Sequence, residues 1–316
     1  MSRREKRIWE LVSTAPQKSL WHVHGVPFRS LVRRIWLSIN EDRLFGHAAE
    51  LGFYFLFALF PALICASSLL GFVARSAHQI FVRLLDYLSL VLPNVAVETV
   101  VNTFEDTSLG ASSGKLTVGL IAALWSGSAG ISAIQDTLNA VYKIVDSRPY
   151  LLARIYAIGL TILESAIFTL ALACLLGADY AARLIDRRSS DAGIRSAAEI
   201  ATQLGGWTLA TSLVLLSFSV IYYWAPDVKK RKWHWLTPGG VIGIVGWVLA
   251  SLIFRVYLHY FDSFSLAYGS LGAVMILLMW FYLTGLTILV GAEVNSEIEA
   301  AAAEQELSSE ETGGSA

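Results

Sequence analysis

The chain has 316 residues, of which 55% are hydrophobic and 16% are charged. Soluble domains carry about 25% charged residues, so this sequence has too few charged side chains to cover a water-facing surface. Its net charge of −1 conceals an uneven distribution, because Lys and Arg crowd residues 1–45 and 229–232 whereas residues 297–316 are acidic. These features exclude an ordinary soluble domain and predict an all-α, polytopic membrane helix bundle.

Residues 1–45 are predicted to form a basic cytoplasmic leader, and the segment 29–40 within it has apolar and basic side chains at helical spacing. The apolar members are Val32, Ile35, Trp36 and Ile39, and the basic members are Arg29, Arg33 and Arg34. A basic amphipathic helix of this kind is suited to the interface of an anionic leaflet. The same residues are equally compatible with a basic flank that only orients the first span.

Six apolar runs follow, each of roughly the 20 residues that span a hydrocarbon core. They lie at about 48–74, 116–135, 155–177, 206–225, 238–260 and 271–295, and we assign 46–298 to one domain of six transmembrane helices. The longest connection, 75–115, has an apolar stripe at 80–88 and is predicted to contain an interfacial amphipathic helix on the outer side. The acidic segment 299–316 is predicted to be a disordered cytoplasmic tail.

Small residues mark two of the spans. The second span contains Ser126 and Ser128 in a run of small and hydroxylated residues, so we expect it to lie inside the bundle rather than against lipid. The fifth span has Gly239, Gly243 and Gly246 at helical spacing. This spacing predicts a smooth face on which a neighbouring helix packs closely.

Basic residues also predict the orientation, because cytoplasmic loops hold the excess of Lys and Arg. The leader, the loop between spans two and three, the loop between spans four and five and the C-terminal tail together hold sixteen, whereas the opposite side holds seven. The sequence therefore predicts a multi-pass protein with its N- and C-termini in the cytoplasm.

Four ordered motifs resemble those of a known family. They are Phe53-Tyr54-x-Leu56-Phe57-x-Leu59-Phe60-Pro61; Leu124-Trp125-Ser126-x-Ser128 with Leu138-Asn139-x-x-Tyr142 and Arg148-Pro149; Tyr223-x-x-Pro226 with Trp233 and Pro238-Gly239; and Tyr268-Gly269-Ser270-Leu271-Gly272-Ala273 with Trp280 and Gly291-Ala292-Glu293-x-Asn295. On these motifs the chain resembles the YihY/BrkB family of bacterial inner-membrane proteins, formerly labelled ribonuclease BN. The resemblance covers most of 45–298 and implies a six-helix bundle in the bacterial inner (cytoplasmic) membrane, but no settled activity. The sequence departs from the pattern at Glu50, Glu164 and Arg255.

The residues do not support the former nuclease label. A metal-dependent nuclease needs several His, Asp or Glu converging on metal ions, whereas the six histidines are scattered and only His22 and His24 form a close pair. The sequence also lacks a Gly-rich phosphate loop followed by Lys and Ser or Thr. We therefore predict no enzymatic activity, no catalytic residue, no cofactor, no metal site and no nucleic-acid partner.

Polar residues at membrane depth are the candidates for function, because they are costly to place in lipid. Glu164, in the middle of the third span, either lines a polar path or is a neutral carboxyl that hydrogen-bonds between helices. Arg255, in the fifth span, either contacts a lipid phosphate or anchors the helix. Tyr222 is read as part of an interfacial aromatic belt. The candidate path or substrate contacts are Glu164, Asn139, Glu293, Asn295, Ser126, Ser128, Arg255 and Tyr268.

Two classes of function remain open. The first is an envelope transporter or lipid-handling protein of unspecified substrate; the second is a structural or interaction protein in which the same residues only pack helices. A polar cavity lined by Glu164, Asn139 and Glu293 would favour the first class, and a solid bundle the second. The expected partners are membrane lipids, with a homo-oligomer left open. The side chains expected to contact anionic headgroups are Arg29, Arg33, Arg34, Lys229, Lys230, Arg231 and Lys232.

Overall fold

The computed structural model is mostly helical in the part of the chain that it describes, which confirms the predicted fold class. It describes residues 3–14, 20–21, 27–72, 113–188, 192–230, 232–260 and 270–313, with a few positions between 82 and 102, and these contain no strand. Most of the predicted interfacial helix at 80–88 lies outside the described residues. The helices are α1 (Arg3–Thr14), α2 (Phe28–Glu41), α3 (Leu44–Phe72), α6 (Ser113–Val141), α7 (Tyr150–Arg188), α8 (Ala192–Trp224), α9 (Pro238–Tyr260) and α11 (Ser270–Gly313).

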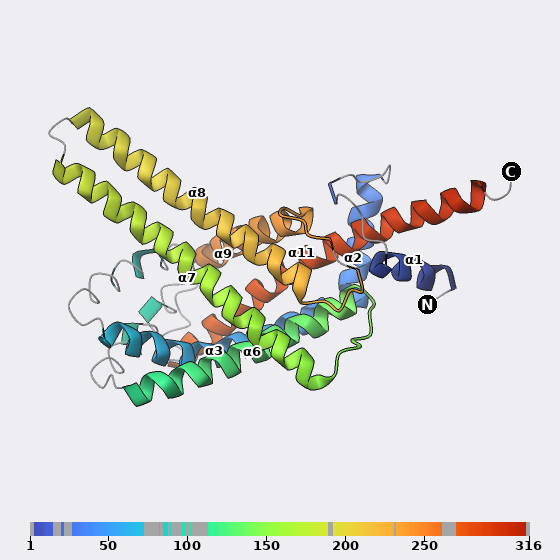
Figure 1. Cartoon of the computed structure of the whole chain (residues 1–316), viewed down its shortest axis with the longest axis horizontal. Coiled ribbons are helices and arrows are strands. Elements are labelled where there is room, and N and C mark those ends of the chain that lie inside the picture. Colours follow the sequence, from blue (N-terminus) through green and yellow to red (C-terminus); the bar gives the residue numbers. More distant parts are fainter. Residues whose placement is uncertain are drawn as a thin grey trace.

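Six helices within these ranges, α3, α6, α7, α8, α9 and α11, are long and apolar enough to cross a membrane. Both chain termini lie at one end of the molecule together with α1 and α2, and we call this the terminal end (Figure 1). Helix α11 packs against α3 and α9, and α3 packs against α6. Helices α7 and α8 form a long hairpin that packs on α6 through α7 and projects away from the other helices (Figure 1).

Apolar side chains fill the core of the bundle and are also exposed on its outside. Leu44, Leu138 and Leu289 are completely buried at the terminal end, whereas Val118 on α6 is 68% exposed. Large exposed apolar side chains on a helix of this length indicate contact with lipid. The prediction that the second span lies inside the bundle is therefore correct only for its half near the terminal end, where residues 128–141 are mostly buried.

The prediction of a disordered tail at 299–316 is wrong for the described residues, because α11 continues to Gly313. At 1.5 Å per residue this helix is about 66 Å long, against a hydrocarbon core of about 30 Å. The second half of α11 buries Ala300–Ala303 and Leu307. Arg34 of α2 also forms an ion pair with Glu304 at 2.8 Å. Alanine favours helix, and this buried run of alanines outweighs the charge pattern that suggested disorder.

The leader folds with this extension of α11 rather than apart from it. Helix α1 is joined to it by Arg4 Nη2, which donates to Ser308 Oγ at 3.2 Å. Helix α2 is joined to it by Ser38 Oγ, which donates to Glu297 Oε1 at 2.7 Å, and by burial of Leu31. The two ends of the chain therefore form one helical assembly beyond the spans.

The predicted glycine face of α9 is confirmed. Gly239 lies so close to α11 that a methyl group there would collide with the carbonyl oxygen of Gly291. A methyl group at Gly243 would lie 2.9 Å from the ring of Phe218 and 3.2 Å from the carbonyl oxygen of Thr287. The missing side chains therefore allow the backbones of α9 and α11 to meet.

This contact predicts that Gly239→Ala destabilises the protein, because the backbone of α9 or α11 must move to accept a methyl group. Gly159→Ala is the matched control, since the added methyl has nothing within 4 Å and alanine favours a helix over glycine by about 1 kcal/mol. In thermal unfolding in detergent, Gly239→Ala should lower the melting temperature and Gly159→Ala should leave it unchanged or raise it. Equal melting temperatures for the two variants would contradict the close backbone contact.

Candidate functional site

Glu164 lies on α7 and faces α8. Ser217 Oγ of α8 donates a hydrogen bond to Glu164 Oε2. The other carboxyl oxygen, Oε1, is buried and has no hydrogen-bond partner among the described residues. The structure thus contains the interhelical hydrogen bond required by one of the two roles considered for this residue.

Beside this pair lies a cavity of about 170 Å³, between the α7–α8 hairpin and helices α9 and α11. We call it the lateral cleft. Its lining residues are Ile167, Phe168 and Ala171 of α7, Val214, Ser217 and Phe218 of α8, Trp247 of α9, and Thr284 and Ile288 of α11. The polar atoms of this lining are engaged within the protein, since Trp247 Nε1 donates to Thr284 Oγ1 at 3.1 Å and Ser217 donates to Glu164. The cleft therefore presents an apolar surface.

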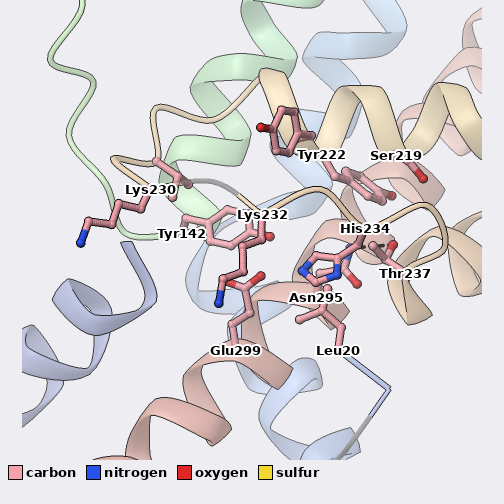
Figure 2. A pocket seen from close by; sticks show the side chains of 12 residues that line it. Leu20, Tyr142, Ser219, Tyr222, Lys230, Lys232, His234, Thr237, Asn295 and Glu299 are labelled. Carbon is pink, nitrogen blue, oxygen red and sulfur yellow. Dashed lines mark hydrogen bonds between the residues drawn. The ribbon is translucent and has the colours of Figure 1, made fainter. Parts of the chain in front are cut away.

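A second cavity, of about 50 Å³, lies at the terminal end and is lined mostly by residues with polar groups (Figure 2). We call it the polar pocket. Segments far apart in the sequence build it: the end of α6, the end of α8, the loop that leads into α9, and α11. Its lining residues are Leu20, Tyr142, Ser219, Tyr222, Tyr223, Val228, Lys230, Lys232, His234, Thr237, Asn295 and Glu299. Three of these side chains are basic types and one is acidic.

Asn295 holds the first turn of α9 at the floor of this pocket. Its Oδ1 accepts a hydrogen bond from the backbone N–H of Gly239 at 2.9 Å, and its Nδ2 donates to Thr237 Oγ1 at 3.1 Å (Figure 2). Thr237 Oγ1 also accepts from the backbone N–H of Gly240 at 2.9 Å. Threonine at an N-cap followed by proline is a favoured helix start, so Asn295 adds a cap from a second helix.

The two cavities share a wall. The rings of Phe218, which lines the cleft, and Tyr222, which lines the pocket, pack edge to face with centroids 5.9 Å apart. The Tyr222 hydroxyl donates to the carbonyl oxygen of Ile288 at 2.8 Å, and the Ile288 side chain lines the cleft. A polar cavity and an apolar cavity therefore adjoin across one pair of aromatic rings on consecutive turns of α8.

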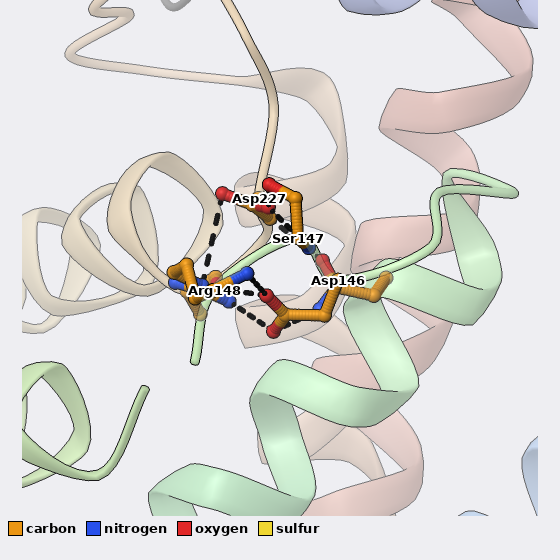
Figure 3. Close-up of polar contacts among 6 residues, drawn as sticks. Asp146, Ser147, Arg148 and Asp227 are labelled. Atoms are coloured by element: carbon orange, nitrogen blue, oxygen red, sulfur yellow. Dashed lines mark hydrogen bonds and ion pairs between the residues drawn. The ribbon is translucent and has the colours of Figure 1, made fainter. Parts of the chain in front are cut away.

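A separate hydrogen-bond network joins the loops that follow α6 and α8 (Figure 3). Asn139 Nδ2 donates to Asp146 Oδ2 at 3.0 Å, and Asn139 Oδ1 accepts from the backbone N–H of Asp227 at 2.7 Å. Arg148 donates to both carboxyl oxygens of Asp146, at 3.0 and 2.7 Å, and lies 3.7 Å from Asp227 Oδ1. Ser147 Oγ donates to Asp227 Oδ2 at 2.6 Å. We call these five residues the loop network.

The charges of the loop network stabilise one another. The Arg148 guanidinium, hydrogen-bonded to Asp146, holds the pKa of that carboxyl below its ordinary value. The same contact raises the pKa of Arg148. Paired hydrogen bonds between arginine and a carboxylate fix both position and orientation. The loop network is therefore a rigid connection, and Asn139 acts within it as a structural link.

Glu293 occupies a buried position next to another ion pair at the terminal end. It is 1% exposed, and its Oε2 has no hydrogen-bond partner among the described residues. Nearby, Lys143 at the end of α6 donates to Asp42 between α2 and α3. Burial raises the pKa of the Asp42 carboxyl, and the contact with Lys143 offsets this only in part. This cluster joins the leader, α6 and α11.

Two of the remaining candidates are held by contacts within their own helix. Ser126 Oγ and Ser128 Oγ donate to carbonyl oxygens of their own helix, Ala122 and Trp125, both at 2.8 Å. Arg255 Nη2 donates to the backbone carbonyl of Ser89, a protein contact that neither of the two expected roles included. Tyr268 lies outside the described residues. The described members of this group, Ser126, Ser128 and Arg255, line neither cavity.

The predicted set is thus divided among separate places. Asn295 lines the polar pocket, Asn139 belongs to the loop network, Glu293 is buried apart, and Glu164 lies beside the lateral cleft. The predicted site residues left out most of the pocket lining, including Tyr142, Tyr222, Thr237 and His234. Tyr222 was read as part of an aromatic belt, but it is 7% exposed. The Thr-Pro helix start and the place of Tyr142 in the second motif were signals that could have indicated two of them.

The Asp146–Arg148 pair predicts a pH dependence. A carboxyl whose pKa is lowered on folding stabilises the fold above its unfolded pKa of about 3.9, and this stabilisation is lost as the pH falls through the folded pKa. Asp146→Asn should therefore lower the melting temperature near neutral pH, and the gap to wild type should narrow below about pH 4. Thermal unfolding in detergent at several pH values measures this. A gap that stays constant into acid would rule out ionic stabilisation by this pair.

Six lipid-facing spans, an apolar cleft between them and a polar pocket at one end define an integral membrane protein of the polytopic α-helical class. The family model described as Virulence factor BrkB matches residues 35–313. The chain therefore belongs to the BrkB family, as the four sequence motifs indicated.

Proteins similar in sequence agree with this family assignment. A ribonuclease-like protein of Bacillus subtilis (strain 168), YfkH, is 33% identical over 252 residues, covering 79% of this chain and 88% of the relative. A UPF0761 membrane protein of Stenotrophomonas maltophilia (strain K279a) is 28% identical over 274 residues, covering 86% of this chain and 61% of the relative. One from Xanthomonas oryzae pv. oryzae (strain PXO99A) is 30% identical, with the same coverage. The chain thus spans 61% of the length of these UPF0761 proteins. No solved structure matches the chain.

The word ribonuclease in the name of the Bacillus relative belongs to that protein. Within the described ranges of this chain, no group of three or more His, Cys, Asp or Glu is placed to hold a metal ion. His22 and His24, the close pair in the sequence, lie outside those ranges. That this chain is not an enzyme stays a prediction.

Proposed function

We propose that the chain is a lipid-handling protein of the bacterial inner membrane, which holds one amphiphile across the polar pocket and the lateral cleft. The observation that carries the proposal is the wall that the two cavities share at Phe218 and Tyr222. A lipid joins a polar head to an apolar tail in one molecule. The two cavities offer adjoining environments that suit these two ends.

The placement of the polar candidates supports lipid handling over a water-filled transport path. A polar path was expected to bring Glu164, Asn139 and Glu293 to one cavity, and in the described chain neither cavity is lined by them. The cleft that adjoins Glu164 is apolar, which suits an acyl chain better than an ion. The alternative, a structural protein without transport, applies if the cleft holds no lipid.

We further propose that the terminal end faces the cytoplasm, so that both termini lie there. One face of α2 carries exposed Arg29 and Arg33 together with exposed Val32, Trp36 and Leu37. Basic and aromatic residues on one helix face suit the anionic surface of the inner leaflet.

Other basic residues divide between lipid and protein contacts. Arg34 points to α11, where it pairs with Glu304, and so contributes less to a lipid contact than expected. Lys229, Lys230 and Lys232 are exposed in the loop before α9 and are proposed to contact headgroups. Arg231 lies outside the described residues.

Reporter fusions test this orientation. Fusions after residue 145 and after residue 231 should report a cytoplasmic position, because both loops join helices at the terminal end. Fusions near residues 105 and 190 should report the outer side. A cytoplasmic signal at 190 combined with an external signal at 231 would invert the proposed orientation.

A variant that fills the lateral cleft tests lipid handling. Val214 lines the cleft, so Val214→Phe should place its larger ring in the space and displace an acyl chain. We expect the protein, extracted in a mild detergent, to lose its tightly bound lipid in native mass spectrometry. Leu209→Phe is the control, since Leu209 is on the same helix but is 57% exposed.

Melting temperatures of both variants should be measured alongside, because an overpacked core would unfold and lose lipid for that reason alone. Retention of the same bound lipid by wild type, Val214→Phe and Leu209→Phe would favour the structural alternative.

A further inference from the structure

The polar pocket has an excess of basic side chains. Lys230, Lys232 and His234 come from the loop before α9, and Glu299 is the single acidic lining residue. The other lining residues are neutral types. Burial raises the pKa of the Tyr142 phenol well above its ordinary value, so Tyr142 is an uncharged hydroxyl. The charge of the lining therefore favours an anion.

The backbone adds to this preference. Helix α9 begins at Pro238, directly after Thr237 of the pocket lining. The N-terminus of a helix carries about half a positive elementary charge. Although Asn295 and Thr237 already accept hydrogen bonds from the first N–H groups, the dipole still acts on an anion nearby. A basic loop and a helix N-terminus thus act on the same small cavity.

The size of the cavity restricts what part of a molecule can enter it. Its volume is about 50 Å³, and a cavity measured in this way needs roughly 10–15 Å³ for one water. Three to five water-sized groups therefore fit, which matches one phosphate group. Lys230 and Lys232 are exposed, and Lys230 points away from the other lining side chains (Figure 2).

We infer that the polar pocket binds the phosphate group of an inner-leaflet lipid whose acyl chain enters the lateral cleft. This inference rests on the proposed function and adds the chemical class of the headgroup. Lys232 and His234 supply the hydrogen-bond donors. Tyr222 lies between the lipid headgroup in the pocket and the acyl chain in the cleft. Glu299 adds one acidic side chain to the same lining.

Two lipids with identical tails separate the contribution of the headgroup. Dioleoyl phosphatidic acid ends in a bare phosphate, whereas dioleoylglycerol has none. Titrated into the full chain in detergent and followed by native mass spectrometry, phosphatidic acid should bind about tenfold tighter or more, as charge-assisted hydrogen bonds require. Inorganic phosphate alone should compete weakly, because it lacks the tail.

Three charge variants identify the pocket as the source of this preference. Lys232→Gln should weaken phosphatidic acid about tenfold and leave dioleoylglycerol unchanged. Lys6→Gln, which removes the same charge from an exposed side chain of α1 outside the pocket, should leave both unchanged. Glu299→Gln should leave the binding of phosphatidic acid unchanged or strengthen it, because any charge on this carboxyl group opposes the anion.

The failures are distinguishable. Equal binding of the two lipids in wild type, with loss of both in Val214→Phe, would overturn the phosphate inference and leave the lipid-handling proposal standing. Binding of neither lipid would overturn both. Inorganic phosphate that binds as tightly as phosphatidic acid would show a site for free phosphate. Weaker phosphatidic acid binding by folded Glu299→Gln would show that the pocket prefers a cationic group.

Discussion

The backbone contact between α9 and α11 determines where both cavities lie. Gly239 and Gly291 bring the two helices together at the terminal end, and Asn295 fixes the first turn of α9 with two hydrogen bonds. Farther along α9, Gly243 leaves the space that the Phe218 ring occupies. The glycines of α9 and α11 therefore determine the lining of the pocket and the wall of the cleft as much as the residues with larger side chains do.

The distribution of polar groups follows from the bilayer. A polar group in the hydrocarbon region must find its partner within the protein, so serine and threonine hydroxyls in the spans mostly return to carbonyls of their own helix. Ion pairs and networks gather instead at the terminal end, in the loops after α6 and α8 and at the leader. Glu164 lies away from that end, and its partner Ser217 lies on the wall of the lateral cleft.

The fold could be predicted because long apolar runs report directly on the bilayer. Helix boundaries could not, since a helical backbone continues where apolar composition stops: α7 extends from Tyr150 to Arg188, well beyond the predicted 155–177. For the site, motif positions correctly drew attention to Asn139 and Asn295, but not to their roles as a loop link and a helix cap. The polar pocket requires several distant segments to meet, and no local pattern encodes that meeting.

The continuous length of α11 has a mechanical consequence. Ile288 at the cleft, Asn295 at the pocket and Glu304 beside α2 all belong to one unbroken helix. The helix axis from Ile288 to Glu304 is about 24 Å long. A tilt of about 5° at Ile288 would therefore displace Glu304 by about 2 Å. Such a rod acts as a lever. A tilt of α11 caused by what fills the lateral cleft would thereby move the part of this helix that packs with α1 and α2, where the two ends of the chain are folded together.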